Sequence, residues 1–448
     1  MTINRRMILT ALLSCTAAIA QAGTQQELEQ RVQALAEQLE AMKAELAQLK
    51  AGQHAAGAAS SVTVASGTAA TPAVAVAPPA AAMAAAAAPV TSPPAAGAAD
   101  TGVSFFGYGE LNYSRPTSNA ASTVADAARF VLGVAYRFDE DTRLVSELEL
   151  EHAIASSEDA GEFELEQAYI ERRLRDNLFV KAGLFLIPSG FLNLSHEPTR
   201  YYGVQRNFIE TAIIPTTWRE GGVQLQGETA AGLAWNVGLS TGFNLNKWDA
   251  SSAEGLESPL GAIHQELSLA SGKDISGFLA LNYVGMPGLK VGGSLFTGGA
   301  SQGQTSLGSS RVTLWEGHAR WTPAQWELSA LYARGRISNT AALNRVSLGQ
   351  PTPIPQSFFG WYTEAAYRAI ERDRWSLTPF VRYERFNTGA SFADLGLGIT
   401  PPDARDREVF TGGVNWMITP GVVIKADYLN FRGGSGDNRW DLGLGYQF

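Results

Sequence analysis

The sequence predicts a transmembrane antiparallel β-barrel of about 16 strands, preceded by a short coiled-coil helix. Apolar and polar residues alternate from Thr101 to Phe448, as strands with one lipid-facing and one water-facing side require. The connections between these runs are alternately short and long, which is typical of outer-membrane barrels and not of soluble sandwiches. No apolar run of about 18 residues follows the N-terminus, which argues against a helical membrane protein.

The composition suits strands that lie between lipid and water. Charged residues make up 17% of the chain, aromatic residues make up 10%, and 46 residues are Gly. The formal net charge of −9 argues against a nucleic-acid partner, because phosphate binding needs Lys and Arg to displace counterions. Cys15 is the only cysteine, which excludes a disulfide or a cysteine metal cluster within one chain.

Residues 1–22 are predicted to be a secretory signal peptide. Arg5 and Arg6 form the positive start, residues 7–13 form the apolar core, and residues 20–22 (Ala-Gln-Ala) form a small-residue cleavage site. A competing interpretation treats Cys15 as the lipid-bearing cysteine of a lipoprotein. Both interpretations predict export from the cytoplasm.

Residues 23–50 are predicted to form a coiled-coil stalk. Their apolar residues repeat at spacings of four and three and lie along one seam: Leu28, Val32, Leu35, Leu39, Met42, Leu46 and Leu49. About three heptads are too short for a stable lone helix, so the seam implies self-association. The alternative is an amphipathic helix that packs on its own barrel. Residues 51–100 are rich in Ala, Pro, Ser and Thr and are predicted to be a linker.

The barrel is predicted to cover residues 101–448. Three runs show the alternation most clearly: Phe130–Phe138, Trp375–Tyr383 and Trp440–Phe448. Trp and Tyr gather near the ends of the runs, as they do in the girdles at membrane interfaces. The predicted strands are 103–114, 128–139, 142–154, 162–175, 177–187, 220–228, 233–243, 274–284, 288–297, 310–321, 325–336, 359–370, 374–387, 406–418, 421–432 and 438–448.

The long connection 188–219 is rich in aromatic and charged residues. Loops of about thirty residues in compact domains are usually functional or disordered, and the aromatic content argues against disorder. By strand count this is the third long loop, and we predict that it folds inward and narrows a pore. The candidate constriction residues are His196, Glu197, Arg200, Tyr201, Tyr202, Arg206 and Arg219, and all of them except Arg219 are candidate solute contacts. The alternative is that the charged residues pin the loop to the wall, with Arg219 as an anchor.

Three segments resemble the phosphate-selective porin superfamily and its proteobacterial relatives: Gly183–Gly190 (GLFLIPSG), Asn207–Val223 (NFIETAIIPTTWREGGV) and Gly107–Asn112 (GYGELN). The Glu-rich pair of strands in Leu144–Ala168 is similar to the same relatives, and the resemblance covers residues 101–448. It implies a trimer of 16-stranded barrels, each narrowed by its third loop. The chain departs from the phosphate-selective members because it lacks their inward ladders of Arg and Lys.

Acidic residues replace those ladders on two neighbouring predicted strands. Alternation places five carboxylates on the water-facing side: Glu147, Glu149, Glu151, Glu164 and Glu166. Such rows favour cations. The alternative is a structural lattice of salt bridges with inward basic residues, and both arrangements are compatible with each other. The candidate basic partners, which would also line the pore, are Arg129, Arg137, Arg143 and Lys181.

The function that these observations predict is passive diffusion of small hydrophilic solutes or ions across the Gram-negative outer membrane, with weak cation preference. The alternatives are an anion- or phosphate-selective porin, or a tether that links the outer membrane to the cell wall through the periplasmic stalk. The expected partners are membrane lipid, lipopolysaccharide and a second and third copy of the chain. No enzyme, cofactor or metal site is predicted: HExxH and P-loop motifs are absent, and His152, His264 and His318 lack ligand spacing.

Overall fold

The computed structural model of the protein describes residues 102–156, 159–304, 308–347, 349–393, 395, 406–432 and 438–448. The chain divides into two units, Met1–Ala82 and Met83–Phe448, and the barrel belongs to the second. The predicted signal peptide, stalk and linker lie outside the described residues.

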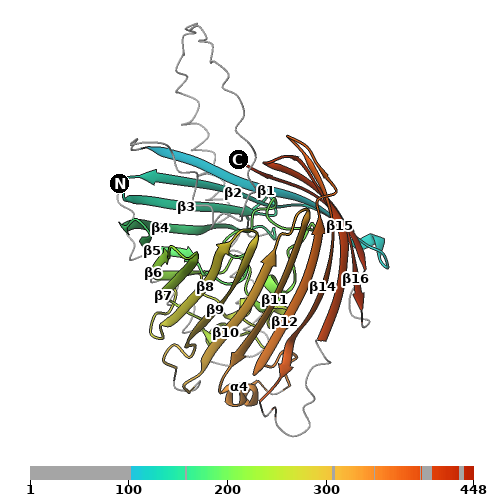
Figure 1. The fold of residues 1–448 in the computed structure, drawn as a ribbon. Helices are drawn as coiled ribbons and strands as arrows, with labels where there is room; N and C mark the ends of the chain where they lie inside the picture. The colour runs from blue at the N-terminus through green and yellow to red at the C-terminus, as the bar shows by residue number, and fades with distance from the viewer. Residues whose placement is uncertain are drawn as a thin grey trace, which may run out of the picture. The chain divides into compact units, whose positions relative to one another are not determined.

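The described residues form one antiparallel sheet whose strands follow one another in chain order (Figure 1). The strands are β1 (Val103–Pro116), β2 (Val124–Arg137), β3 (Thr142–Glu151), β4 (Phe163–Arg175), β5 (Leu178–Leu186), β6 (Arg219–Glu228), β7 (Leu233–Ser240), β8 (Ser276–Met286), β9 (Leu289–Gly299), β10 (Arg311–Trp321), β11 (Trp326–Ile337), β12 (Ser357–Tyr367), β13 (Ile370–Glu371), β14 (Ser376–Ser391), β15 (Asp406–Thr419), β16 (Val422–Arg432) and β17 (Arg439–Gln447).

The sheet closes on itself because β17 pairs with β1, from Tyr108 opposite Gln447 to Pro116 opposite Arg439. The two-residue β13 follows β12 along the same edge of β14, so these two pieces occupy one position in the wall. The result is a closed barrel of 16 strands, which confirms the predicted fold class. Closure leaves no strand edge unpaired, which is how a sheet satisfies its backbone polar groups in lipid.

Side chains along the wall alternate between an exposed outer face and a buried inner face. On β3, for example, Leu148 is 37% exposed while its neighbours Glu147 and Glu149 are 8% and 1% exposed. The period-two pattern of the sequence therefore corresponds to the outside and inside of the barrel. Among the described residues, no helix is long and apolar enough to cross a membrane.

Short turns join the strands at one end of the barrel and long loops join them at the other, as the sequence predicted. The predicted run 359–370 is interrupted, however, because β12 ends at Tyr367 and pairing resumes at Ile370. The long loops carry short helical turns: η1 (Ala120–Ser122), η2 (Ile209–Ile213), η3 (Leu245–Lys247), α3 (Glu254–Glu257), η4 (Gly261–Ile263) and α4 (Thr340–Val346).

An apolar core lies inside the barrel rather than between two layers. Its members include Phe185 and Phe296 from the inner face of the wall and Phe243 and Leu260 from the loop after β7. The loop between β5 and β6 contributes Trp218 and its neighbours to the same core. The interior is therefore partly filled by loops that fold in from the long-loop end.

Candidate functional site

The connection between β5 and β6, residues 187–218, is fixed by two of its own side chains. Asn193 Nδ2 donates to the carbonyls of Ile187 and Trp218 at 2.7 and 2.8 Å, which holds the two ends of the loop together. Glu210, which is 3% exposed, accepts the backbone N–H groups of Phe191 and Leu192 at 2.6 and 2.7 Å. Burying a carboxylate is costly unless it is hydrogen-bonded, so these bonds specify one conformation of the loop.

We call residues 208–218 the apolar arm of this loop. Ile209, Ile213 and Trp218 are each 0% exposed. The Trp218 ring lies 5.3 Å from that of Phe243 and 4.6 Å from that of Phe296, measured between centroids. The helical turn η2 contacts β11, β12 and β14, on the wall opposite the strands that the loop connects. The apolar arm thus crosses the interior and is held by burial of large side chains.

A glycine on the wall makes the close approach of η2 to β12 possible. A Cβ atom at Gly360 would lie 3.0 Å from Cγ1 of both Ile209 and Ile213, which is tighter than ordinary van der Waals contact. Any larger residue at this inward position of β12 would push the apolar arm away from the wall.

We call residues 194–207 the polar arm. Wall carboxylates and amides accept its backbone donors: Asp427 Oδ2 from Val204 N at 2.6 Å, and Asn415 Oδ1 from Gly203 N at 3.2 Å. Arg382 Nη1 donates to the carbonyl of Tyr202 at 3.1 Å. β14, β15 and β16 therefore hold the polar arm mainly through hydrogen bonds, several of which involve charged groups.

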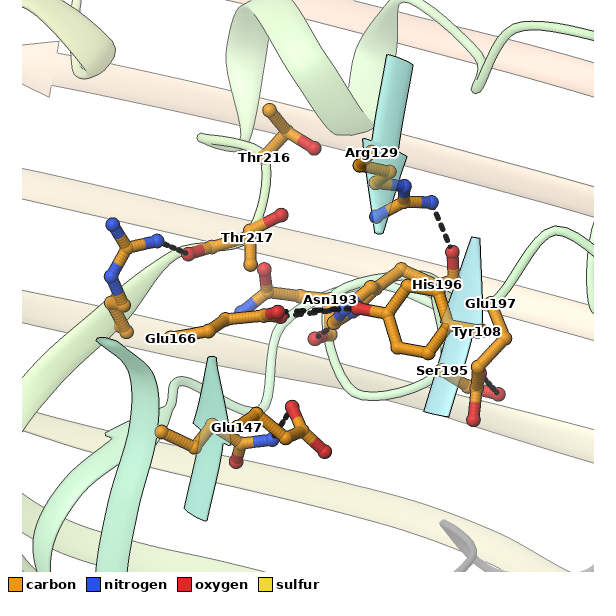
Figure 2. Close-up of polar contacts among 12 residues, drawn as sticks. Tyr108, Arg129, Glu147, Glu166, Asn193, Ser195, His196, Glu197, Thr216 and Thr217 are labelled. Carbon is orange, nitrogen blue, oxygen red and sulfur yellow. Dashed lines mark hydrogen bonds and ion pairs between the residues drawn. The ribbon is translucent and has the colours of Figure 1, made fainter. Parts of the chain in front are cut away.

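His196 attaches the polar arm further along the same wall, at β1 and β4. Figure 2 shows the His196 ring between Tyr108 and Glu166, with Nε2 2.6 Å from Tyr108 Oη and 2.7 Å from Glu166 Oε1. Arg129 on β2 donates to the His196 carbonyl at 2.6 Å. Nearby, Tyr201 Oη donates to Glu110 Oε2 at 2.8 Å. The polar arm is thus bonded along one arc of the wall that runs from β14 through β17 and β1 to β4.

The protonation of His196 depends on this setting. Burial by itself lowers the pKa of His196, but the adjacent Glu166 carboxylate outweighs burial and raises that pKa to about 9. The imidazolium is therefore the form of His196 at neutral pH, and its contact with Glu166 is an ion pair.

All five predicted acidic residues face the interior, but they do not form one open row. Glu147, Glu149 and Glu166 are 8%, 1% and 0% exposed, while Glu151 and Glu164 are half-buried. Glu166 pairs with His196, and Glu164 pairs with Arg219. Two of the five carboxylates, Glu164 and Glu166, therefore pair with the loop or its end.

The predicted alternative, a lattice of salt bridges between the five glutamates and inward basic residues, does not form with the expected partners. Arg129 pairs with Glu110, its cross-strand neighbour, at 2.7 Å. Arg143 and Lys181 both pair with Glu171, which lies between them in register. Arg137 lies opposite Arg143 and makes no ion pair with any described residue. The register, including a bulge at Glu166, decides these pairs and is not visible in the sequence.

The candidate loop residues divide into anchors and free side chains. Arg219 pairs with Glu266 at 2.9 Å in addition to Glu164, and Tyr202 stacks on Phe380 at 5.7 Å between centroids. Arg206 donates to Thr216 and Thr217, within its own loop. Glu197 accepts from Ser195 at 3.5 Å, and Arg200 is exposed. Of the charged side chains on the polar arm, Glu197, Arg200 and Arg206 therefore make no described ion pair with the wall.

Several residues that shape this site were not among the candidates. They include Tyr108, Glu110, Asn193, Glu210, Arg382, Asn415 and Asp427. A signal existed for the wall residues, since each occupies an inward position on an alternating strand, where a polar side chain needs a partner.

The spacing GxSxG, which marks the nucleophile of many hydrolases, occurs at 238–242 and 299–303. That chemistry places the serine on a turn from a strand into a helix. Ser240 Oγ instead donates to the carbonyl of Thr241 at 2.7 Å, and Ser301 Oγ donates to Asp274 at 3.2 Å. Neither serine contacts a histidine among the described residues, so neither site resembles a catalytic triad.

Comparison with known proteins supports the fold. No family model matches the sequence. The chain is 29% identical over 341 residues to an uncharacterized protein of Aquifex aeolicus (strain VF5), covering 73% of this chain and 75% of that protein. Among solved structures it is similar to OmpF of Salmonella typhi in complex with daunomycin, at 13% identity and a TM-score of 0.54, covering 78% of this chain and 98% of that one. A loop-deletion mutant of the outer membrane protein OmpT of Vibrio cholerae has 12% identity, a TM-score of 0.49 and coverage of 78% and 99%. The barrel therefore has the architecture of outer-membrane porins.

Proposed function

We propose that the protein is an outer-membrane channel for passive diffusion of small hydrophilic solutes or ions. Barrels of about 16 strands leave an aqueous channel unless loops fill it. The observation that carries the proposal is the loop 187–218, which leaves β5, contacts β11, β12 and β14 across the interior, and is hydrogen-bonded to the wall again at β16 and β1. A loop held in this way narrows the passage while the strands keep it open.

Deleting part of the polar arm tests this proposal. Removal of residues 194–206 is expected to raise the single-channel conductance in planar bilayers, because the strands hold the wall and this segment only occupies the interior. Removal of an equal number of residues from the loop 338–356 is the matched control and is expected to change conductance less. Unchanged conductance after removal of 194–206, with a barrel that still folds, would contradict a constricting role.

We further propose a weak preference for cations, set mainly by Glu147, Glu149, Glu151, Glu164 and Glu166. The inward orientation of these carboxylates supports the proposal, and the two half-buried members have the most direct access to ions. Changing all five to Gln is expected to shift the reversal potential in a salt gradient toward anions. The preference is expected to fade near 1 M salt, where the screening length is about 3 Å.

The second candidate is an anion- or phosphate-selective channel. Lys290 and Arg320 lie opposite each other on β9 and β10, and both face the interior near Phe191. Anion selectivity of the unmodified channel, or block of its chloride current by low phosphate, would establish this candidate instead. The same bilayer measurement therefore decides between the two.

We also propose that the protein is a homotrimer with a periplasmic stalk. The heptad seam from Leu28 to Leu49 and the resemblance to trimeric porins support this proposal. Light scattering of the intact protein tests it, and a monomer would refute it. Pulldown of cell wall with and without residues 23–100 tests the alternative role as a tether.

A further inference from the structure

Three arginines form an unpaired basic cluster on the outer face of the wall at the long-loop end. Arg334 and Arg336 continue the outward alternation of β11, and Arg311 begins β10. Arg336 lies opposite Thr313, so Arg311 is its diagonal neighbour across the two strands. All three side chains are exposed, and no described acidic residue forms an ion pair with any of them.

The outward arginine on β14 differs from this cluster. Arg385 forms an ion pair with Asp406 at 2.6 Å. Arg115 on β1 and Arg432 on β16 are also exposed without a described ion pair, but each stands alone on its strand. The cluster of three is on β10 and β11, at the level where their outward aromatic residues Trp315 and Tyr332 stand 5.3 Å apart. Aromatic side chains at this level are typical of the boundary between lipid tails and headgroups.

A groove of about 470 Å³ lies on the same outer face, nearer the short-turn end. Small residues form its floor, Ala319, Ala330 and Ala365, and larger apolar residues flank it, including Leu328, Val381 and Phe410. Ala330 and Arg334 are on the same strand and the same face, four residues apart, which corresponds to about 13 Å. The groove and the basic cluster are therefore aligned along the direction in which an acyl chain would extend.

We infer that this surface binds a phosphorylated glycolipid of the outer leaflet, that is, lipopolysaccharide, with phosphate on the arginines and an acyl chain in the groove. Guanidinium groups bind phosphate oxygens in pairs, and Arg336 has two arginine neighbours within about 8 Å: Arg334 on its own strand and Arg311 diagonally across. A second copy of the chain would have to bring acidic groups to this level. The outward Asp406 there is paired with Arg385, and the outward Glu408 lies between Arg385 and Arg432 in register. The inference rests on the proposed outer-membrane location but not on channel activity.

The test uses the full-length protein, delipidated in detergent and titrated with bisphosphorylated lipid A. The double variant Arg334→Ser/Arg336→Ser is expected to bind about five-fold more weakly for each arginine removed. The matched control Arg372→Ser/Arg374→Ser removes two exposed arginines from the short-turn end and is expected to bind as the unmodified protein does. Ala330→Trp fills the groove and is expected to weaken binding about four-fold for each methylene that it excludes.

Three results would overturn the inference. The first is an equal loss of lipid A binding in the Arg334/Arg336 variant and in the Arg372/Arg374 control. The second is equal affinity for phosphatidylglycerol and lipid A, which would indicate a general surface for anionic phospholipid. The third is dissociation of the oligomer by Ala330→Trp with lipid binding unchanged, which would assign the groove to a second copy of the chain. Conductance measured on the same variants separates loss of this site from failure of the channel proposal, because these residues face away from the interior.

Discussion

The two arms of the loop 187–218 are attached to the same wall by different forces. The apolar arm is held by burial of Ile209, Ile213 and Trp218, which involves neither a titrating group nor charges that salt can screen. The polar arm is held by hydrogen bonds and ion pairs from His196, Val204 and their neighbours, which do depend on pH and salt. We therefore expect the apolar arm to act as a fixed base and the polar arm to be the part that responds to conditions.

The largest effect is expected from Trp218→Ala. Truncating a fully buried aromatic side chain costs about 3–5 kcal/mol of unfolding free energy, because a cavity remains beside Phe243 and Phe296. Urea unfolding of the protein in lipid vesicles measures the loss. Trp321→Ala is the control, since Trp321 is 51% exposed on the outer face. Equal losses in the two variants would show that the apolar arm is not a packed part of the interior.

A smaller effect on stability is expected from substituting two glycines, one beside each arm, and these two variants compare the arms directly. Gly360→Ala brings Cβ to 2.9 Å from Phe386 Cβ and 3.0 Å from Ile209 Cγ1, in a packed core that cannot yield. Overpacking of this kind costs about 1–3 kcal/mol, and conductance is expected to stay unchanged.

Gly445→Ala on β17 is the matched change at the polar arm, because its Cβ would lie 2.5 Å from Cβ of Pro198. We expect a smaller loss of stability and a noisier channel, because the polar arm can shift away. A larger loss of stability in Gly445→Ala than in Gly360→Ala, with a noisier channel only in Gly360→Ala, would mean that the polar arm is the rigid one.

The smallest effect is expected from pH. The pKa of His196 lies above its usual value, so the stabilisation from its ion pair is fully present below about pH 6.5 and is lost as pH rises through about 9. Conductance is therefore expected to rise between pH 7 and about 10 as the polar arm loosens. His196→Gln removes the titrating group and is expected to abolish this step. A rise in conductance of the same size in His196→Gln would show that other groups cause the pH dependence.

The wall was predictable from sequence because its signal is local. Alternation such as Phe130 to Phe138 is repeated in every strand, and a one-residue slip would turn the apolar set inward. The inward loop was predicted from its length and aromatic content, and the structure places it inside. Its partners were not predictable, because Phe208 N donates to Glu384 across 176 residues and Thr199 donates to Gln447 across 248 residues.

The ion pairs on the wall show the same limit. The sequence identified inward basic and acidic residues, but Arg143 and Lys181 meet Glu171 instead of the predicted acidic row. The charges that become neighbours depend on the register between strands and on the bulge at Glu166. Neither feature can be read from the composition or the periodicity of the sequence.

The attachment of Thr199 to β17 has a consequence for the order of assembly. Gln447 is the last residue of β17, and β17 reaches β1 only when the sheet closes. Contacts between residues so distant in sequence form late, because loop-closure entropy opposes them until the intervening strands are paired. During folding the contact of Thr199 with the wall must therefore stay unformed until the final strand is in place. Completion of the wall, and not local sequence, sets the moment at which the interior takes its final form.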